Sequence, residues 1–154
     1  MASQPSSVAL LIVGAGPVGL FGAYYAGVRT LKTAVVDSLE EVGGQITAMY
    51  PEKAIFDVAG FPSIKGRDLV AQLTAQAAPF SPEYLLGHQA DGLTTTDDGF
   101  TVTTTGGAVI NTRAILITGG IGTFTPRPRS LAHRSLPSPS GRPTSRISAV
   151  KGAS

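Results

Sequence analysis

The run Val8-Ala-Leu-Leu-Ile-Val-Gly-Ala-Gly-Pro-Val-Gly19 joins an unbroken apolar stretch directly to the spacing Gly-x-Gly-x-x-Gly. A continuous apolar run of this length is typical of a strand buried on both faces of a sheet. Eighteen positions after Gly19, an acidic residue ends a second apolar stretch, Thr33–Asp37. A strand, a glycine turn, a helix and a second strand with a terminal acid form a βαβ unit, which predicts a parallel sheet.

Each glycine of this motif has its own predicted role in binding a dinucleotide. Gly14 permits a sharp turn out of the strand, Gly16 lets the backbone approach a pyrophosphate, and Gly19 lets the helix lie close to the sheet. The helix N-terminus offers free N–H groups and a positive dipole end to the phosphates. Asp37 is placed to accept hydrogen bonds from a ribose, which favours FAD or NAD over NADP. The alternative is a glycine-rich turn without a ligand, and the complete βαβ context argues against it.

The rest of the chain up to residue 124 predicts an α/β domain. Val18, Phe21, Tyr25 and Val28 have helical spacing, and Pro17 is tolerated in the first turn of that helix. A turn at Gly43-Gly44-Gln45 opens a short segment, residues 52–65 look irregular, and residues 66–78 form a second helix with Leu69, Leu73 and Ala77 as its apolar positions. From Tyr84 onward, short strands with turns at 97–99 and 106–107 predict an antiparallel meander, and residues 114–117 return to the parallel sheet beside the first strand.

The composition changes after Phe124. Residues 1–124 hold six basic and ten acidic side chains, whereas residues 125–154 hold six basic and no acidic ones. Ser130–Ser154 contains seven serines, three prolines and three arginines, with no helical or strand period. Two interpretations of residues 125–154 stay open: a disordered basic tail, or a stretch that is not the native continuation, such as an out-of-frame read. Residues 1–7 are expected to be a flexible N-terminus.

Several function classes are disfavoured by composition. The chain has no cysteine, so it has neither a disulfide nor a thiolate site, and His88 and His133 lack partners at ligand spacing. No stretch approaches the roughly 20 apolar residues of a membrane span, and the N-terminus does not read as a signal peptide, so we expect a cytoplasmic protein without membrane contact. The acidic body also argues against nucleic-acid binding.

Several runs of the chain together resemble one family. They are residues 14–21, 23–27, 37–39, 43–45, 50–53 (Tyr-Pro-Glu-Lys), 56–62 (Phe-Asp-Val-Ala-Gly-Phe-Pro) and 118–124 (Thr-Gly-Gly-Ile-Gly-Thr-Phe), followed by Pro126 and Arg127. From about Val8 to Arg129 the chain resembles the N-terminal part of the thioredoxin-reductase-like ferredoxin–NADP(+) reductases, in the wider pyridine nucleotide-disulfide oxidoreductase superfamily. The run 50–62 separates this family from its relatives. Glutathione-reductase-type enzymes are excluded because Gln45-Ile46-Thr47 stands where they carry a cysteine pair.

The resemblance implies that residues 8–124 are the N-terminal half of a Rossmann-like FAD-binding domain, with a parallel sheet and a small antiparallel meander, and that this domain is incomplete. It places Asp37, Gln45, Tyr50, Ala90 and Phe124 against FAD: Asp37 at the ribose, Gln45 and Tyr50 on the flavin side, Ala90 at the adenine and Phe124 as an apolar wall. The full set of candidate cofactor-binding residues is Gly14, Gly16, Pro17, Gly19, Asp37, Gly44, Gln45, Tyr50, Ala90, Gly119 and Phe124.

The resemblance also implies an electron transfer from NADPH through FAD to ferredoxin, in which the flavin supplies the chemistry and no side chain is nominated as catalytic. NADPH is a cosubstrate of the full-length family, and its domain is absent here. A homodimer is a family expectation. We therefore predict a truncated reductase with weak or no turnover. The alternatives are a non-catalytic FAD-binding module or pseudogene product, a thioredoxin reductase-like fragment, and an NAD-binding dehydrogenase fragment.

Overall fold

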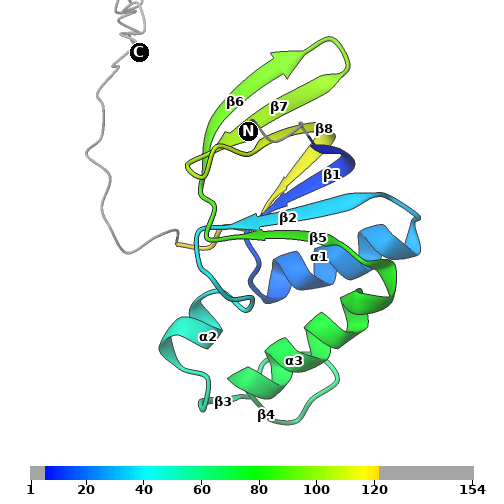
Figure 1. Cartoon of the computed structure of the whole chain (residues 1–154). Helices are drawn as coiled ribbons and strands as arrows, with labels where there is room; N and C mark the ends of the chain where they lie inside the picture. The colour runs from blue at the N-terminus through cyan, green and yellow to red at the C-terminus, as the bar shows by residue number, and fades with distance from the viewer. Residues whose placement is uncertain (1–5, 122–154) are drawn as a thin grey trace, which may run out of the picture. The chain divides into compact units, whose positions relative to one another are not determined.

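A mixed six-stranded sheet with helices packed on it forms the domain that the computed structural model describes, residues 6–121 (Figure 1). Its strand order is β5-β2-β1-β8-β7-β6, and a separate pair, β3 and β4, forms a two-stranded sheet. In chain order the elements are β1 (Ser6–Val13), α1 (Pro17–Val28), β2 (Thr33–Asp37), α2 (Gln45–Met49), β3 (Ala54–Ile55), β4 (Ile64–Lys65), α3 (Gly66–Ala77), the 3-10 turn Ala78–Phe80, β5 (Glu83–Leu86), β6 (Ala90–Thr96), β7 (Gly99–Thr104) and β8 (Val109–Ile117).

Four strands run parallel, in the order β5-β2-β1-β8. Val13, the last residue of β1, lies beside Val36 of β2 and Ile117 of β8, so the carboxyl ends of these three strands share one edge of the sheet. The predicted return of residues 114–117 beside the first strand is therefore confirmed. Loops at the carboxyl edge of a parallel sheet are where ligands of open α/β folds bind.

The predicted antiparallel meander is also confirmed. β6 pairs with β7 and β7 with β8, each antiparallel, through the turns at residues 97–98 and 105–108. β8 belongs to both parts of the sheet, because it pairs in parallel with β1 on its other side. The α/β fold class, with a parallel sheet and a small antiparallel meander, holds for the described residues.

The two faces of the sheet carry two apolar clusters. Leu11 belongs to the first cluster, with Val36, Val102 and Ile110. Ile12 belongs to the second, on the helical side, with Val35, Ala23 of α1 and Ala77 at the end of α3. Both Leu11 and Ile12 are completely buried, so β1 is covered on both faces, as its unbroken apolar sequence predicts.

Helix α1 forms where predicted, and the four apolar residues whose spacing identified it lie on its exposed side. Val18, Phe21, Tyr25 and Val28 keep 48–68% of their surface exposed. The buried residues of α1 are instead Leu20 and four small residues, Gly19, Ala23, Ala26 and Gly27. The reason is that small side chains let a helix lie close to a sheet, and α1 uses them for that contact.

Three further details differ from expectation: the start of β1, the structure of residues 52–65 and the buried face of α3. Ser6 and Ser7, assigned to a flexible N-terminus, lie in β1, which begins two residues earlier than predicted. The segment 52–65, expected to be irregular, contains the antiparallel pair β3–β4, in which Ala54 faces Lys65 and Ile55 faces Ile64. In α3, Leu69 and Ala77 are buried as predicted, Val70 is buried as well, and Leu73 is only half-buried. The predictions for residues 1–5, Phe124, His133 and the 125–154 tail fall outside the described residues.

Candidate functional site

Three loops meet at the carboxyl edge of the parallel sheet, and backbone hydrogen bonds join them. Gly14 donates its N–H to the carbonyl of Val36 at 2.8 Å, so the glycine turn is tied to β2. Gly43 donates to the carbonyl of Ala15 at 2.8 Å, which brings the second glycine turn against the first. Thr118 donates to the carbonyl of Val13 at 2.8 Å, which adds the loop after β8. The structure thus brings together segments separated by up to a hundred residues.

The motif glycines divide into packing positions and one open position. Gly14 has φ +113°, and a Cβ there would stand 2.5 Å from the carbonyl oxygen of Thr118, so no other residue fits without strain. A Cβ on Gly19 would overlap the carbonyl of Gly14. By contrast, a Cβ on Gly16 would meet nothing within 4 Å. Gly16 therefore faces free space at the mouth of the loop, where its backbone can contact a ligand.

The N-terminus of α1 begins at this open position. Gly16 is its N-cap residue, Pro17 occupies the first turn, and no side chain caps the helix. The first turn also contains no acidic side chain. An uncapped helix N-terminus leaves N–H groups and the positive end of the helix dipole available to an anion. The geometry around Gly16 and Pro17 fits a pyrophosphate group.

Asp37 is engaged by the backbone on both carboxylate oxygens. Oδ2 accepts a hydrogen bond from the N–H of Ala15 at 2.6 Å, and Oδ1 accepts one from the N–H of Leu39 at 2.9 Å. The sequence predicts a ribose partner for this carboxylate and does not predict these two bonds. Each carboxylate oxygen has a second lone pair, so Asp37 can hold the loop and still accept a hydroxyl.

The second glycine turn places Gln45 beside the first. Gly43 and Gly44 have φ values of +106° and +58°, and a Cβ on Gly44 would lie 3.1 Å from Cα of Gly16. Gln45 is the first residue of α2 and is half-buried. Because Gly44 packs against the open position of the first loop, Gln45 starts its helix next to the space over Gly16.

Tyr50 follows α2, and the residues directly after it are hydrogen-bonded to the start of α3. The carbonyl of Pro51 accepts a bond from the N–H of Arg67 at 2.8 Å, and that of Lys53 accepts one from Gly66 at 3.0 Å. The Tyr50 side chain retains 38% exposure, and the Lys53 ammonium lies 5.4 Å from the centre of its ring. An aromatic face on a tethered loop is suitable for stacking.

Glu52, within the same loop, forms an exposed cluster of ion pairs. Its carboxylate accepts bonds from Lys65 Nζ at 3.1 Å and from Arg67 Nη1 at 2.6 Å. The hydrogen bond from Lys65, with the positive charge of Arg67, holds the pKa of Glu52 below its ordinary value of 4.5. The cluster connects the Tyr50 loop to β4 and to the start of α3.

Ala90 begins β6 two residues after His88, whose backbone contacts that of Asp37. The N–H of His88 bonds to the backbone carbonyl of Asp37 at 2.9 Å, two residues before Ala90 begins β6. A register irregularity follows between Ala90 and Gly92, which is typical of a β-bulge. Gly119 lies in the loop after β8, and a Cβ there would meet nothing within 4 Å. Phe124, the remaining candidate, lies outside the described residues.

Thr118 is a residue whose role in the loop the sequence did not single out. Its hydroxyl lies 3.1 Å from the carbonyl oxygen of Val13 and 2.9 Å from that of Gly14. Thr118 directly follows the apolar strand β8, so it lies at the carboxyl edge of the sheet. That position was the one feature of the sequence that could have identified Thr118 as part of the loop. Thr118 fixes the turn from which the glycine motif begins.

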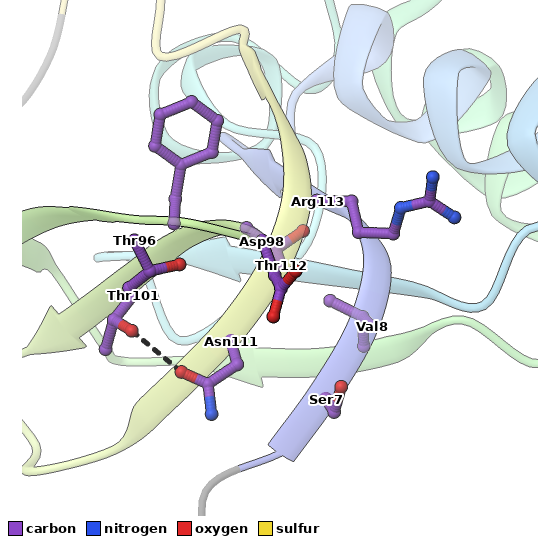
Figure 2. A pocket seen from close by; sticks show the side chains of 9 residues that line it. Ser7, Val8, Thr96, Asp98, Thr101, Asn111, Thr112 and Arg113 are labelled. Carbon is purple, nitrogen blue, oxygen red and sulfur yellow. Dashed lines mark hydrogen bonds between the residues drawn. The ribbon is translucent and has the colours of Figure 1, made fainter.

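A cavity of about 290 Å³ lies at the other edge of the sheet, near the amino ends of β1 and β8. Two of the polar side chains that line it are hydrogen-bonded to each other, because Thr101 Oγ1 donates to Asn111 Oδ1 at 2.8 Å. Figure 2 shows the Arg113 guanidinium pointing away from that pair. The position at the amino ends separates this cavity from the glycine loops. Within residues 6–121, no group of three or more metal-ligating side chains gathers, and no helix is long and apolar enough to span a membrane.

Comparisons with known proteins found similar sequences and similar folds, although no family model matches the chain. The chain is 61% identical over 127 residues to a ferredoxin–NADP reductase of Salinispora tropica, covering 82% of this chain and 39% of that protein. It is 60% identical over 119 residues to the one of Frankia alni, covering 77% of this chain and 37% of that protein, and 52% identical over 118 residues to the one of Thermus thermophilus, covering 77% and 35%. The chain spans about two fifths of the length of these curated relatives.

Solved structures with a similar fold include thioredoxin reductases. The enzyme from Gloeobacter violaceus has a TM-score of 0.64 and 27% identity, covering 81% of this chain and 41% of that one. The enzyme from T. acidophilum has a TM-score of 0.62 and 27% identity, covering 72% and 34%. In both structures, the match covers less than half of the longer protein.

Proposed function

Since the chain is a relative of the ferredoxin–NADP reductases and spans about two fifths of their length, we propose that residues 8–124 are a dinucleotide-binding domain that holds FAD. The observation that carries this proposal is the free space over Gly16 at the uncapped N-terminus of α1. Among residues 6–121, no atom lies within 4 Å of a Cβ placed on Gly16, whereas a Cβ on Gly14 or Gly19 would collide with neighbouring backbone.

The residues at the carboxyl edge have distinct proposed roles. Gly14 and Gly19 shape the turn, and Gly16 and Pro17 leave the α1 N-terminus open to the pyrophosphate. Asp37 accepts a ribose hydroxyl through its free lone pairs, and the backbone at Ala90 meets the adenine. On the flavin side, Gly44 lets Gln45 approach, Tyr50 offers its ring, Gly119 leaves room, and Phe124 is proposed as an apolar wall.

FAD supplies the redox chemistry by accepting a hydride and releasing single electrons. The chain's own residues bind and orient the cofactor, and none of them is proposed as an acid, base or nucleophile. The full reaction, between NADPH and ferredoxin, is proposed from the name of the relatives. Homodimerisation is a further proposal.

A second candidate function follows from the partial coverage. The match spans 39% of the S. tropica reductase, so the similarity concerns only a part of that enzyme. A non-catalytic FAD-binding module is therefore the alternative to a reductase with weak turnover.

Calorimetric titration of the purified chain with FAD and, separately, with NAD tests the proposal. We expect binding of FAD with a flavin absorbance spectrum on the protein. Reduction of ferredoxin by NADPH in the presence of the FAD-loaded chain favours the reductase, and flavin binding without NADPH oxidation favours the module. Folded protein that binds neither dinucleotide contradicts both.

A further inference from the structure

The connection between β5 and β6 is hydrogen-bonded to the turn that contains Asp37. The N–H of Gly87 donates to the carbonyl of Leu39 at 2.8 Å, and the N–H of His88 donates to the carbonyl of Asp37 at 2.9 Å. The N–H of Leu39 in turn donates to the Asp37 carboxylate at 2.9 Å. The backbone of His88 therefore belongs to the same set of bonds that holds the Asp37 carboxylate in place.

The His88 side chain joins this connection to β7 and to the turn after it. Its Nδ1 lies 3.1 Å from Oγ1 of Thr104, a residue that is only 4% exposed. A Cβ on Gly106 would overlap the His88 ring, so a glycine at that position leaves the ring its place. His88 thus contacts the Asp37 turn through its backbone and the β7–β8 turn through its side chain.

The direction of the bond between His88 and Thr104 follows from the other partner of the hydroxyl oxygen. Oγ1 of Thr104 accepts a hydrogen bond from the N–H of Ala108 at 3.1 Å. Because an amide N–H cannot accept, the hydroxyl hydrogen is left for Nδ1 of His88. A neutral imidazole accepts at one ring nitrogen and carries its proton on the other, so this arrangement puts the proton of His88 on Nε2. The reverse direction would leave the hydroxyl hydrogen of a buried threonine without a partner among the described residues, which costs free energy.

The strand ladder alone gives Ala90 little support. Ala90 pairs with Thr104, but the register shifts between Ala90 and Gly92, and regular pairing continues only from Gly92 onward. Such an irregularity interrupts the ladder and leaves a residue unpaired. The bond from the Thr104 hydroxyl to His88 therefore ties the two chain segments together at the point where the ladder is interrupted.

We propose that His88 is a positioning residue for the adenosine end of FAD, and that it acts as the hydrogen-bond acceptor that holds Ala90 at a fixed place beside Asp37. The inference rests on the proposed function, in which Asp37 receives the ribose and the backbone at Ala90 meets the adenine. His88 touches no part of the cofactor in this role. It connects the two residues that do, since its backbone is bonded to Asp37 and its side chain is bonded to the strand opposite Ala90.

The alternative role of His88 is to fill the space beside Gly106. That role needs the volume of the ring and does not need its acceptor nitrogen. His88→Leu supplies apolar volume without an acceptor, whereas His88→Asn supplies an acceptor oxygen at the place of Nδ1 without the ring. The two variants therefore separate positioning from packing.

The first test measures the affinities of the full chain and its variants for FAD and for ADP by calorimetry. His88→Leu should weaken FAD binding at least about threefold, because the loss of one hydrogen bond loosens the adenosine site, and His88→Asn should weaken it less than about twofold. ADP shares the adenosine end, so its affinity should fall by the same factor as that of FAD. The absorbance spectrum of bound flavin at saturation should stay unchanged. Urea unfolding establishes that each variant is folded under these conditions.

A double-mutant cycle tests whether His88 acts through Thr104. Thr104→Val keeps the shape of the side chain and removes the donor, so it should also weaken FAD binding at least about threefold. Adding His88→Leu to it should cost less than about a further twofold, because the bond is already lost. The matched control is Thr101→Val on the same strand, whose hydroxyl bonds to Asn111 and not to His88, and which should leave both affinities unchanged.

The tautomer of His88 gives a measurement that leaves its contacts intact. In the His133→Gln chain His88 is the only histidine, and nitrogen NMR at about pH 8 should find the ring proton on Nε2. A proton on Nδ1, equal losses of affinity in His88→Leu and His88→Asn, or additive losses in the cycle would overturn the proposal. A native chain that binds FAD and is unaffected by His88→Leu overturns this inference alone, whereas a native chain that binds neither FAD nor ADP overturns the proposed function with it.

Discussion

The carboxylate of Asp37 accepts a hydrogen bond from the backbone N–H of Ala15 at 2.6 Å, across 22 residues of sequence. Its other oxygen accepts a bond from the N–H of Leu39 at 2.9 Å. The acid at the end of β2 thus fixes the glycine turn whether or not a ligand is bound. A group proposed to recognise a ribose is also part of the framework of the site.

We therefore expect Asp37→Asn to lower both stability and FAD affinity. An amide offers one acceptor oxygen, so one of the two backbone N–H donors faces an NH₂ group. The loss of a partly buried hydrogen bond of this kind costs about 1–3 kcal/mol. Urea unfolding measures the first effect and calorimetry the second. The control is Asp57→Asn at an exposed position, and equal stability of the Asp37 and Asp57 variants would contradict the structural role.

Gly14→Ala and Gly16→Ala should separate folding from binding. At Gly14 an alanine needs φ +113° and collides with the Thr118 carbonyl, so we expect a loss of at least about 2 kcal/mol in unfolding free energy. At Gly16 the φ of −71° is ordinary and no atom lies within 4 Å of a Cβ, so the change should stay within about 1 kcal/mol.

The binding result for Gly16→Ala is the decisive one. A methyl group would occupy the space assigned to the pyrophosphate, so FAD affinity should fall at least about tenfold, or 1.4 kcal/mol, in protein that remains folded. Thermal melting and far-UV circular dichroism establish the fold of the variant. Unchanged FAD affinity in Gly16→Ala would place the cofactor elsewhere.

Much of this site could be predicted from short-range patterns. The strand Thr33–Asp37 was predicted with its observed bounds, because a buried parallel strand has a continuous apolar sequence between turn signals. The return of residues 114–117 to the sheet followed for the same reason. The contact of Gly44 with Gly16 could not be predicted, because it depends on how two loops pack after the sheet has formed.

The burial pattern of α1 could not be predicted from spacing alone. Periodicity identifies apolar positions, and α1 has apolar residues on two sides: Leu20 with glycines and alanines on the buried side, and larger residues such as Phe21 and Tyr25 on the exposed side. Which side packs on the sheet depends on how closely the helix approaches it, and glycine and alanine allow a close contact. For Asp37 the sequence predicts a carboxylate that serves a ligand, and this stays a prediction. Its two backbone bonds could not be predicted, because they depend on the observed turn geometry.

The Glu52 ion pairs should contribute stability only above acidic pH. The pKa of Glu52 in the folded protein is below its ordinary value of 4.5, so folding is favoured while the carboxylate is ionised in both states. That contribution is complete above about pH 4.5 and is lost as the pH falls through the folded pKa. Glu52→Gln should therefore lower the melting temperature slightly at pH 7 and less at pH 3.

Salt provides the control for this prediction. Because the carboxylate, Lys65 and Arg67 are all exposed, the difference between the native chain and Glu52→Gln should shrink in high salt at pH 7. A difference that persists in high salt, or that grows toward pH 3, would show that Glu52 acts through packing and not through charge.

Thr118 should stabilise the glycine turn through its hydroxyl, which lies within hydrogen-bond distance of the carbonyls of Val13 and Gly14. Thr118→Val keeps the shape of the side chain and removes the donor, so we expect a loss of about 1 kcal/mol in unfolding free energy. Thr118→Ser keeps the donor and should lose less. Since the hydroxyl holds the carbonyl of Gly14, the residue that begins the turn, Thr118→Val should also weaken FAD binding, whereas Thr118→Ser should not. A loss of FAD affinity in Thr118→Ser but not in Thr118→Val would assign the role of Thr118 to its methyl group, and the clamp on Gly14 would then have no part in shaping the cofactor loop.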